Sequence, residues 1–423
     1  MPTLNKMRTA LSGAVSRKTR PWPLDSTDPH LVRLRIAITA FFAMDGFLFA
    51  GWVVRIPAIK AQTGAGAGTL GLALLGVSAG AVAFMIVTGR LCRRFGTHPV
   101  TVASGAALSL SILLPPLTHS ATALGLVLLV FGAAYGSLNV AMNSAAVDLI
   151  GALRRPVMSS FHAAFSLGGM LGAGLGGLIA GSLSPTVHLL LLAAIGLLVT
   201  AVAGRSLRAQ PTPVAAERLP ASGGRGEETQ SGPRTGGVGR SRRPGRLVLV
   251  FGLIALCTAY GEGAMADWGA LHLTQDLAAG PGAAAAGYAV FALAMTAGRL
   301  SGTAVVQRFG PARALIAGGT TATAGMLLGA LAPTVWAACA GFAVAGLGLA
   351  NIFPIAIARA GETGGPDGVA AASTIGYGGM LLGPPAIGFL AEAFTLPAAL
   401  TTVALLAAVA VVIAYATRGA HRS

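Results

Sequence analysis

Two carboxyl side chains interrupt strongly apolar stretches of the sequence, and both are candidates for carrying protons. Asp45 lies mid-way along an apolar run over residues 36-54, and Glu262 lies within a second run over 247-271. An ionisable group at the centre of a membrane helix costs about 3 kcal/mol, so such a group must face protein or water. A partly dry cavity disfavours the charged form of a carboxyl, which lets it exchange a proton when its access switches. The alternative is a carboxyl that pairs with a basic residue only for packing.

Other polar side chains in apolar runs supply further candidates. Histidine is the side chain whose proton equilibrium lies closest to neutral pH, so His162 could relay protons, or it could be a hydrogen-bonded packing residue. The remaining residues are amides and phenols that either bind a hydroxylated substrate or link helices: Asn139, Asn143, Asn351, Tyr135 and Tyr377.

Arg55 and Asp267 lie near the predicted outer ends of their helices. Opposite charges at one end of a helical bundle can close it, so we expect these two residues to form an external gate. A simple anchoring role at the membrane surface is the alternative for Asp267.

The composition places all of these residues in a membrane. Hydrophobic residues make up 54% of the 423 positions, charged residues only 10%, and the mean hydropathy is +0.74. Apolar runs of helix-spanning length, rich in Gly and Ala, predict an all-α membrane protein of twelve transmembrane helices. The predicted spans are 36-54, 69-89, 99-118, 122-147, 157-182, 185-204, 247-271, 284-304, 311-331, 334-358, 369-391 and 396-416.

The distribution of charge explains the formal net charge of +16. With these spans, every Lys and Arg except Arg55 and Lys60 falls on the side of the N-terminus. Basic residues accumulate on the cytoplasmic side of membrane proteins. The sequence therefore predicts a multi-pass inner-membrane protein with both termini in the cytoplasm, and it argues against a nucleic-acid partner.

The chain divides into two related halves. We predict a cytoplasmic tail over 1-35, six-helix bundles over 36-204 and 247-416 joined by a disordered cytoplasmic linker over 205-246, and a short tail over 417-423. Three strings recur in order at nearly constant offset, which indicates duplication: Arg94-Phe95-Gly96 as Arg308-Phe309-Gly310, Gly136-Ser137-Leu138-Asn139 as Gly348-Leu349-Ala350-Asn351, and Gly168-Gly169-Met170-Leu171 as Gly378-Gly379-Met380-Leu381. We expect pseudo-two-fold symmetry between the bundles.

The sequence contains no recognisable enzyme motif. No two-histidine metal motif, phosphate-binding loop or dinucleotide fingerprint occurs, and Gly136-Ser137 is not followed by the residue that an intramembrane serine protease needs. The three cysteines have no metal-ligand spacing. We expect no enzymatic activity, no cofactor and no metal.

The loop after the second predicted span resembles the cytoplasmic motif of the major facilitator superfamily. The string is Gly89-Arg90-Leu91-Cys92-Arg93-Arg94-Phe95-Gly96, and Arg308 and Gly310 repeat its end. The family carries an acid where Arg93 stands, and that acid helps to lock the cytoplasmic side, so the resemblance leaves this lock in doubt.

Strings over 52-60, 156-162 and 261-268 resemble a bacterial branch near the fucose-permease-like transporters. In those relatives a first-span Asp and a fourth-span Glu take part in proton coupling. Asp45 matches the first, whereas Asn139 and Asn143 stand in the fourth span.

The resemblance implies a monomeric, proton-coupled secondary transporter that moves a small molecule through the lipid bilayer by alternating access. A proton-linked efflux antiporter for amphipathic compounds and a non-transporting membrane sensor are the alternatives.

Overall fold

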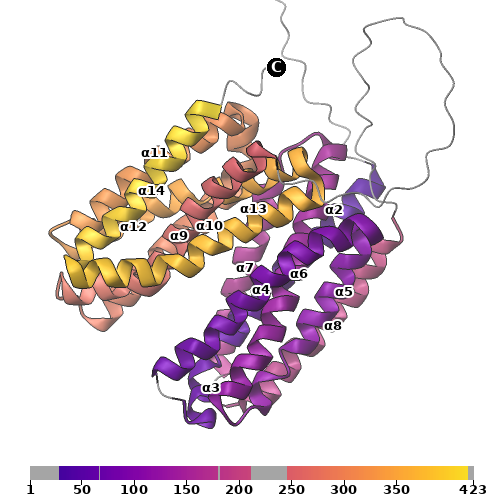
Figure 1. Ribbon diagram of the computed structural model, residues 1–423, viewed down its shortest axis with the longest axis horizontal. Helices are drawn as coiled ribbons and strands as arrows, with labels where there is room; N and C mark the ends of the chain where they lie inside the picture. Colours follow the sequence, from indigo (N-terminus) through magenta and orange to yellow (C-terminus); the bar gives the residue numbers. More distant parts are fainter. Residues whose placement is uncertain (1–27, 66, 180–181, 211–244, 418–423) are drawn as a thin grey trace, which may run out of the picture.

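The computed structural model describes residues 28-65, 67-179, 182-210 and 245-417. Over these ranges the chain forms two helical bundles that follow each other along the sequence (Figure 1). Most of the predicted N-terminal tail and of the predicted linker lies outside the described residues, so the disorder of the linker stays a prediction.

The first bundle contains six long helices, and proline or a capping hydroxyl begins several of them. Ser120 Oγ accepts the Ala123 N-H at 3.2 Å, and Ser184 Oγ accepts the Val187 N-H at 3.3 Å. The long helices are α2 (Pro29–Val53), α4 (Ala67–Phe95), α5 (Thr97–Ser111), α6 (Ala121–Leu153), α7 (Met158–Ile179) and α8 (Pro185–Arg208), with the short α3 (Ile56–Thr63) and the 3-10 turn η1 (Pro115–Leu117) between them.

The second bundle repeats this arrangement. Its helices are α9 (Arg246–Gln275), α10 (Pro281–Phe309), α11 (Pro311–Leu331), α12 (Val335–Leu349), α13 (Ile352–Ala393) and α14 (Leu396–Thr417). Helix α2 packs on α7 and α8, and its repeat partner α9 packs on α13 and α14. The two halves that the sequence repeat relates therefore share the same pattern of helix–helix contacts.

Helix α13 contains a reversal: its first arm completes the crossing that α12 begins, and its second arm is a separate crossing. Gly365 has φ 58° and ψ −149°, a conformation that suits glycine. A Cβ on Gly376 would lie 2.9 Å from the Phe353 ring, although a straight helix would separate these residues by about 35 Å. The described residues contain eleven apolar helical stretches long enough to span a membrane, and the reversal divides the longest of them. The predicted twelve-helix, all-α fold is confirmed.

Glycines allow the repeat-related helices to approach closely. A Cβ on Gly168 of α7 would collide with the backbone of Ala43 on α2, and one on Gly379 of α13 would collide with the backbone of Leu256 on α9. Close packing of this kind is typical of helices in lipid. It fixes α2 and α9, which carry Asp45 and Glu262.

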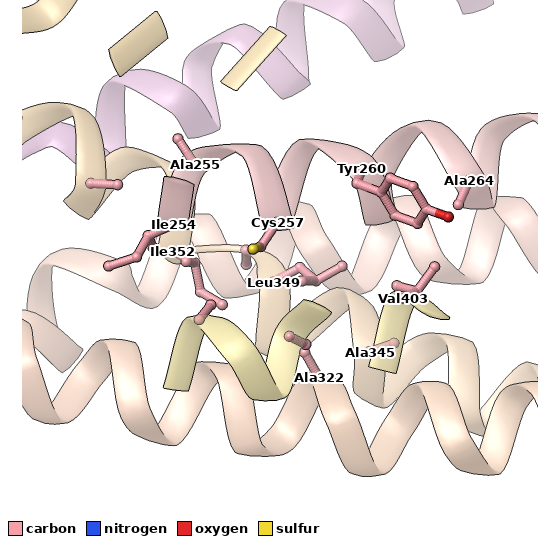
Figure 2. Packing of buried hydrophobic residues seen from close by; sticks show 14 of the residues in the cluster. Ile254, Ala255, Cys257, Tyr260, Ala264, Ala322, Ala345, Leu349, Ile352 and Val403 are labelled. Atoms are coloured by element: carbon pink, nitrogen blue, oxygen red, sulfur yellow. The ribbon is translucent and has the colours of Figure 1, made fainter. Parts of the chain in front are cut away.

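Each bundle has an apolar core, and the core of the second bundle continues into the first through Ala81, Met85 and Val140. Figure 2 shows part of the second core, where Cys257 and Tyr260 extend from α9 towards Leu349 and Val403. The Tyr260 hydroxyl lies 2.9 Å from Thr402 Oγ1, so its polar end is satisfied within the same bundle.

The two bundles contact each other over one half of their length. We call the end at which α8 finishes and α9 begins the linker end, and the opposite one, next to α3, the far end. Helices α4 and α7 of the first bundle pack against α13 and α10 of the second. Among the described residues, the hydrogen bonds and ion pairs between bundles run from Arg93 and Asp367 at the linker end to Tyr135 and Tyr377 near mid-helix. The described structure is therefore closed at the linker end.

Candidate functional site

A ladder of polar side chains crosses the middle of the protein. His162 Nε2 lies 3.3 Å from Asn143 Oδ1, and Asn143 Nδ2 donates to the Asn139 carbonyl at 2.8 Å. Asn139 Nδ2 then donates to the Tyr377 hydroxyl at 3.3 Å, and Tyr377 donates to the Tyr135 hydroxyl at 3.2 Å. This polar ladder joins α7, α6 and α13, so it connects the two bundles through hydrogen bonds.

Asp45 lies beside the polar ladder on the inner face of α2. Its side chain is fully buried, and neither carboxyl oxygen has a hydrogen-bond partner among the described residues. Phe42, one turn before it, lies edge-on to His162 with ring centroids 5.3 Å apart. Phe49, one turn after it, stacks on Tyr135 at 4.9 Å. Positions three and four apart share a helix face, so Asp45 lies between the two ends of the ladder.

Glu262 lies on the equivalent helix of the second bundle, but its carboxylate is paired. Arg299 Nη2 donates to Glu262 Oε1 at 2.9 Å, and Arg299 Nη1 donates to Ser166 Oγ at 2.7 Å. Ser166 belongs to α7 of the first bundle, so the guanidinium connects the two halves. Asp45 and Glu262 both lie close enough to Tyr135 and Tyr377 to act electrostatically on their hydroxyls.

Sequence reasoning missed Arg299. Its position near the end of a predicted span made it one of the basic residues used to assign topology. The side chain is instead buried, at 7% exposed. The signal that could have found it was Glu262 itself, because a carboxylate inside a membrane helix needs a partner, and the next helix carries this arginine within its own predicted span.

Two other predicted groups lie away from the polar ladder. Asn351, at the junction of α12 and α13, donates an Nδ2 hydrogen to the Gly298 carbonyl of α10 at 2.8 Å. Arg55 Nε donates to His188 Nδ1 at 2.6 Å, within the first bundle. Asp267 lines a separate cavity of about 570 Å³ with Trp268. The structure does not bring Arg55 and Asp267 together, so the external gate stays a prediction.

The linker-end motif keeps its geometry in both halves. Gly96 and Gly310 have φ values of 87° and 80°, and the preceding phenylalanines lie beneath Arg94 and Arg308 at 5.3 and 5.7 Å. Arg93, which replaces the acid of the resembling family, forms an ion pair with Asp367 at the start of the second arm of α13. An ion pair therefore connects the two bundles at this motif, with the basic residue on α4 and the acidic residue on α13.

The described residues contain no cluster of three or more possible metal ligands. The arrangement offers two intramembrane carboxyls in contrasting environments, one arginine shared by both halves, and a hydrogen-bonded ladder of amides and phenols. Such a site can take up and release protons and can exchange internal hydrogen bonds for bonds to a polar ligand.

Comparison with known proteins supports this description. Residues 36–265 match the Major Facilitator Superfamily. An uncharacterised MFS-type transporter of Yersinia pestis is 36% identical over 371 residues, which cover 87% of this chain and 91% of that protein. Membrane protein MosC of Rhizobium meliloti is 30% identical over 87% of this chain and 86% of its own length.

Solved structures share the fold. The transporter FucP in its outward conformation superposes with a TM-score of 0.72 at 17% identity, covering 90% of this chain and 97% of that one. The human organic anion transporter MFSD10 has a TM-score of 0.69 at 15% identity, covering 91% and 99%. These matches, together with the two six-helix bundles, show that the chain belongs to the Major Facilitator Superfamily and is a multi-pass membrane transporter.

Proposed function

We propose that this protein is a proton-coupled secondary transporter that moves a small polar molecule across a bacterial inner membrane by alternating access. The observation that carries the proposal is the contrast between its two intramembrane carboxyls. Asp45 is fully buried and has no hydrogen-bond partner within the described part of the chain, whereas Glu262 pairs with Arg299 at 2.9 Å. Both stand next to hydrogen bonds that join the two halves.

The two carboxyls suit different stages of a proton cycle. Burying an ionised carboxylate without a partner costs several kcal/mol, so the surroundings of Asp45 favour its neutral, protonated form. Glu262 instead forms an ion pair with the Arg299 guanidinium. When the halves separate at the linker end, water reaches Asp45 and its proton can leave. We assign Asp45 as the principal proton carrier.

Arg299 links protonation to movement of the bundles. Its guanidinium holds Glu262 on α9 and Ser166 on α7 at the same time. Protonation of Glu262 would remove the ionic part of the first bond and release the arginine to reorient. The contact with Ser166 would then weaken, and the closed linker end would become easier to open.

The basic residues assign the linker end to the cytoplasm. On that assignment the structure is closed to the cytoplasm. A protein with the same fold is a fucose:proton symporter, and the amides and phenols of the polar ladder suit hydroxyl groups. We therefore favour a neutral, hydroxyl-bearing substrate.

The test begins with a substrate found by thermal-shift screening of the purified protein, because a ligand of the folded state raises its apparent stability. Transport is then followed in proteoliposomes together with a pH-sensitive dye inside the vesicles. Asp45→Asn and Glu262→Gln should keep substrate binding and lose accumulation against a gradient. Glu392→Gln, a change at an exposed carboxyl of the far end, is the matched control.

The sign of the proton signal distinguishes the two modes of coupling. Protons that enter with the substrate indicate symport, and protons that leave as the substrate enters indicate antiport. If both carboxyl variants still concentrate substrate like the wild type, the carboxyls are structural and the coupling mechanism is wrong.

A further inference from the structure

The two bundles meet at the linker end through two junctions that the repeat relates. Gly89 of α4 faces Ala370 of α13, where a Cβ on the glycine would lie 2.9 Å from the Ala370 Cβ. Gly302 of α10 faces Ser159 of α7 in the same way, and a Cβ there would lie 2.5 Å from the Ser159 Cβ. Gly302 follows Gly89 by 213 positions, and Ala370 follows Ser159 by 211. The junctions are thus pseudo-symmetric copies.

The symmetry ends about one helical turn nearer the linker. At the first junction, Arg93 and Asp367 form an ion pair between the bundles. The corresponding residues at the second junction are Gln307 and Pro156, which cannot form an ion pair. In their place the structure has a cavity of about 510 Å³ between the bundles, which both of these residues line.

The lining of this linker-end cavity combines positive charge with apolar walls. Arg154 and Arg155 reach it from the loop after α6, and neither has a carboxylate partner among the described residues. Arg359 and Glu362 also line it, and these two side chains pair with each other at 2.7 Å. Ile150, Met158 and Ile355 supply apolar surface. The volume lies in the range of small-molecule sites, roughly 300 to 1,000 Å³.

We propose that the linker-end cavity binds an amphipathic anion, with a phosphate or carboxylate group at Arg154 and Arg155 and a short apolar portion against the aliphatic walls. Both bundles contribute to the lining, so the complete site exists only while the linker end is closed. A ligand that binds one conformation shifts the population towards it. Occupancy would therefore hold the transporter in this state, as the Arg93–Asp367 pair does at the first junction.

The probe is hexyl phosphate, added to purified full-length protein in a neutral detergent. We expect a saturable rise in the unfolding temperature that hexanol at equal concentration does not produce. The double variant Arg154→Gln, Arg155→Gln should weaken binding about tenfold or more, because charge-assisted hydrogen bonds to the anion are lost. The control Arg205→Gln, Arg208→Gln removes two exposed arginines of α8 at the same end and should bind like the wild type.

A second readout tests the conformational effect. Spin labels on the two bundles at the linker end should report a larger short-distance population with hexyl phosphate than without it. The proposal is overturned if hexyl phosphate gives no saturable shift, if the shift survives in the cavity variant, or if the distances do not change. None of these results bears on proton coupling, which the vesicle assay tests separately.

The natural anion could be a lipid headgroup or a soluble metabolite. Repeating the titration in nanodiscs of neutral phosphatidylcholine, with and without phosphatidylglycerol, distinguishes the two. Competition by phosphatidylglycerol supports the proposal with lipid as occupant, and undiminished hexyl phosphate binding supports it with a soluble anion.

Discussion

Replacing Arg299 by glutamine tests whether this residue connects the two halves as the geometry indicates. The substitution removes the bond to Glu262 at 2.9 Å and the bond to Ser166 at 2.7 Å. Removing one partner of a buried ion pair costs about 3 to 5 kcal/mol, but Glu262 is 22% exposed, so water will solvate part of its stranded charge. We therefore take about 2 kcal/mol for that charge and about 2 kcal/mol for the lost charge-assisted bond to Ser166.

The expected loss in the free energy of unfolding is thus about 4 kcal/mol for Arg299→Gln. In a Glu262→Gln background no carboxylate is stranded, so the same substitution should cost about 2 kcal/mol less. Chemical unfolding in mixed detergent micelles, followed by tryptophan fluorescence, measures all four members of this double-mutant cycle. Arg90→Gln, at an exposed arginine, is the control and should change stability by less than about 0.5 kcal/mol.

The cycle can also contradict the geometry. If the two single substitutions are additive within about 0.5 kcal/mol, Arg299 and Glu262 do not interact energetically. If Arg299→Gln is as mild as the Arg90 control, the guanidinium is not a structural link between the bundles.

Three further predictions concern helix packing, the linker-end ion pair and the polar ladder. Gly168→Ala should destabilise the protein by about 1 to 3 kcal/mol in the same unfolding assay, because its Cβ would meet the α2 backbone, whereas Gly174→Ala has open space and should be close to neutral. Asp367→Arg should shift the conformational population towards an open linker end by a factor of about 2 to 5 in cysteine-accessibility measurements, and adding Arg93→Asp should restore closure. A double variant as open as the single one would refute the pair. Tyr377→Phe removes two hydrogen bonds between the bundles and should weaken substrate binding while leaving the unfolding free energy within about 2 kcal/mol of the wild type; an unchanged substrate dissociation constant would remove it from the site.

The sequence by itself determined the positions of the helices, the internal repeat and the candidate residues of the functional site. Hydropathy is summed over neighbours along the chain, so a run of apolar residues predicts a span without knowledge of any other helix. Asp45 and Glu262 were identified for the same local reason, because an ionisable side chain within an apolar membrane-spanning run costs free energy. The superfamily also followed from local strings such as the loop around Gly89 and Gly96.

Only the tertiary structure decided how these residues are paired. Whether a buried carboxyl has a partner depends on the neighbouring helices. This separates Asp45, which has no hydrogen-bond partner among the residues that the structure describes, from Glu262, which pairs with Arg299. The linker-end motif shows the same limit. Arg93 in place of an acid suggested a lost lock, but an ion pair requires only opposite charges on the two facing helices, and Asp367 supplies the acid from the other one. Helix periodicity gives the face on which a side chain lies, whereas its partner is set by the packing of helices far apart in the sequence.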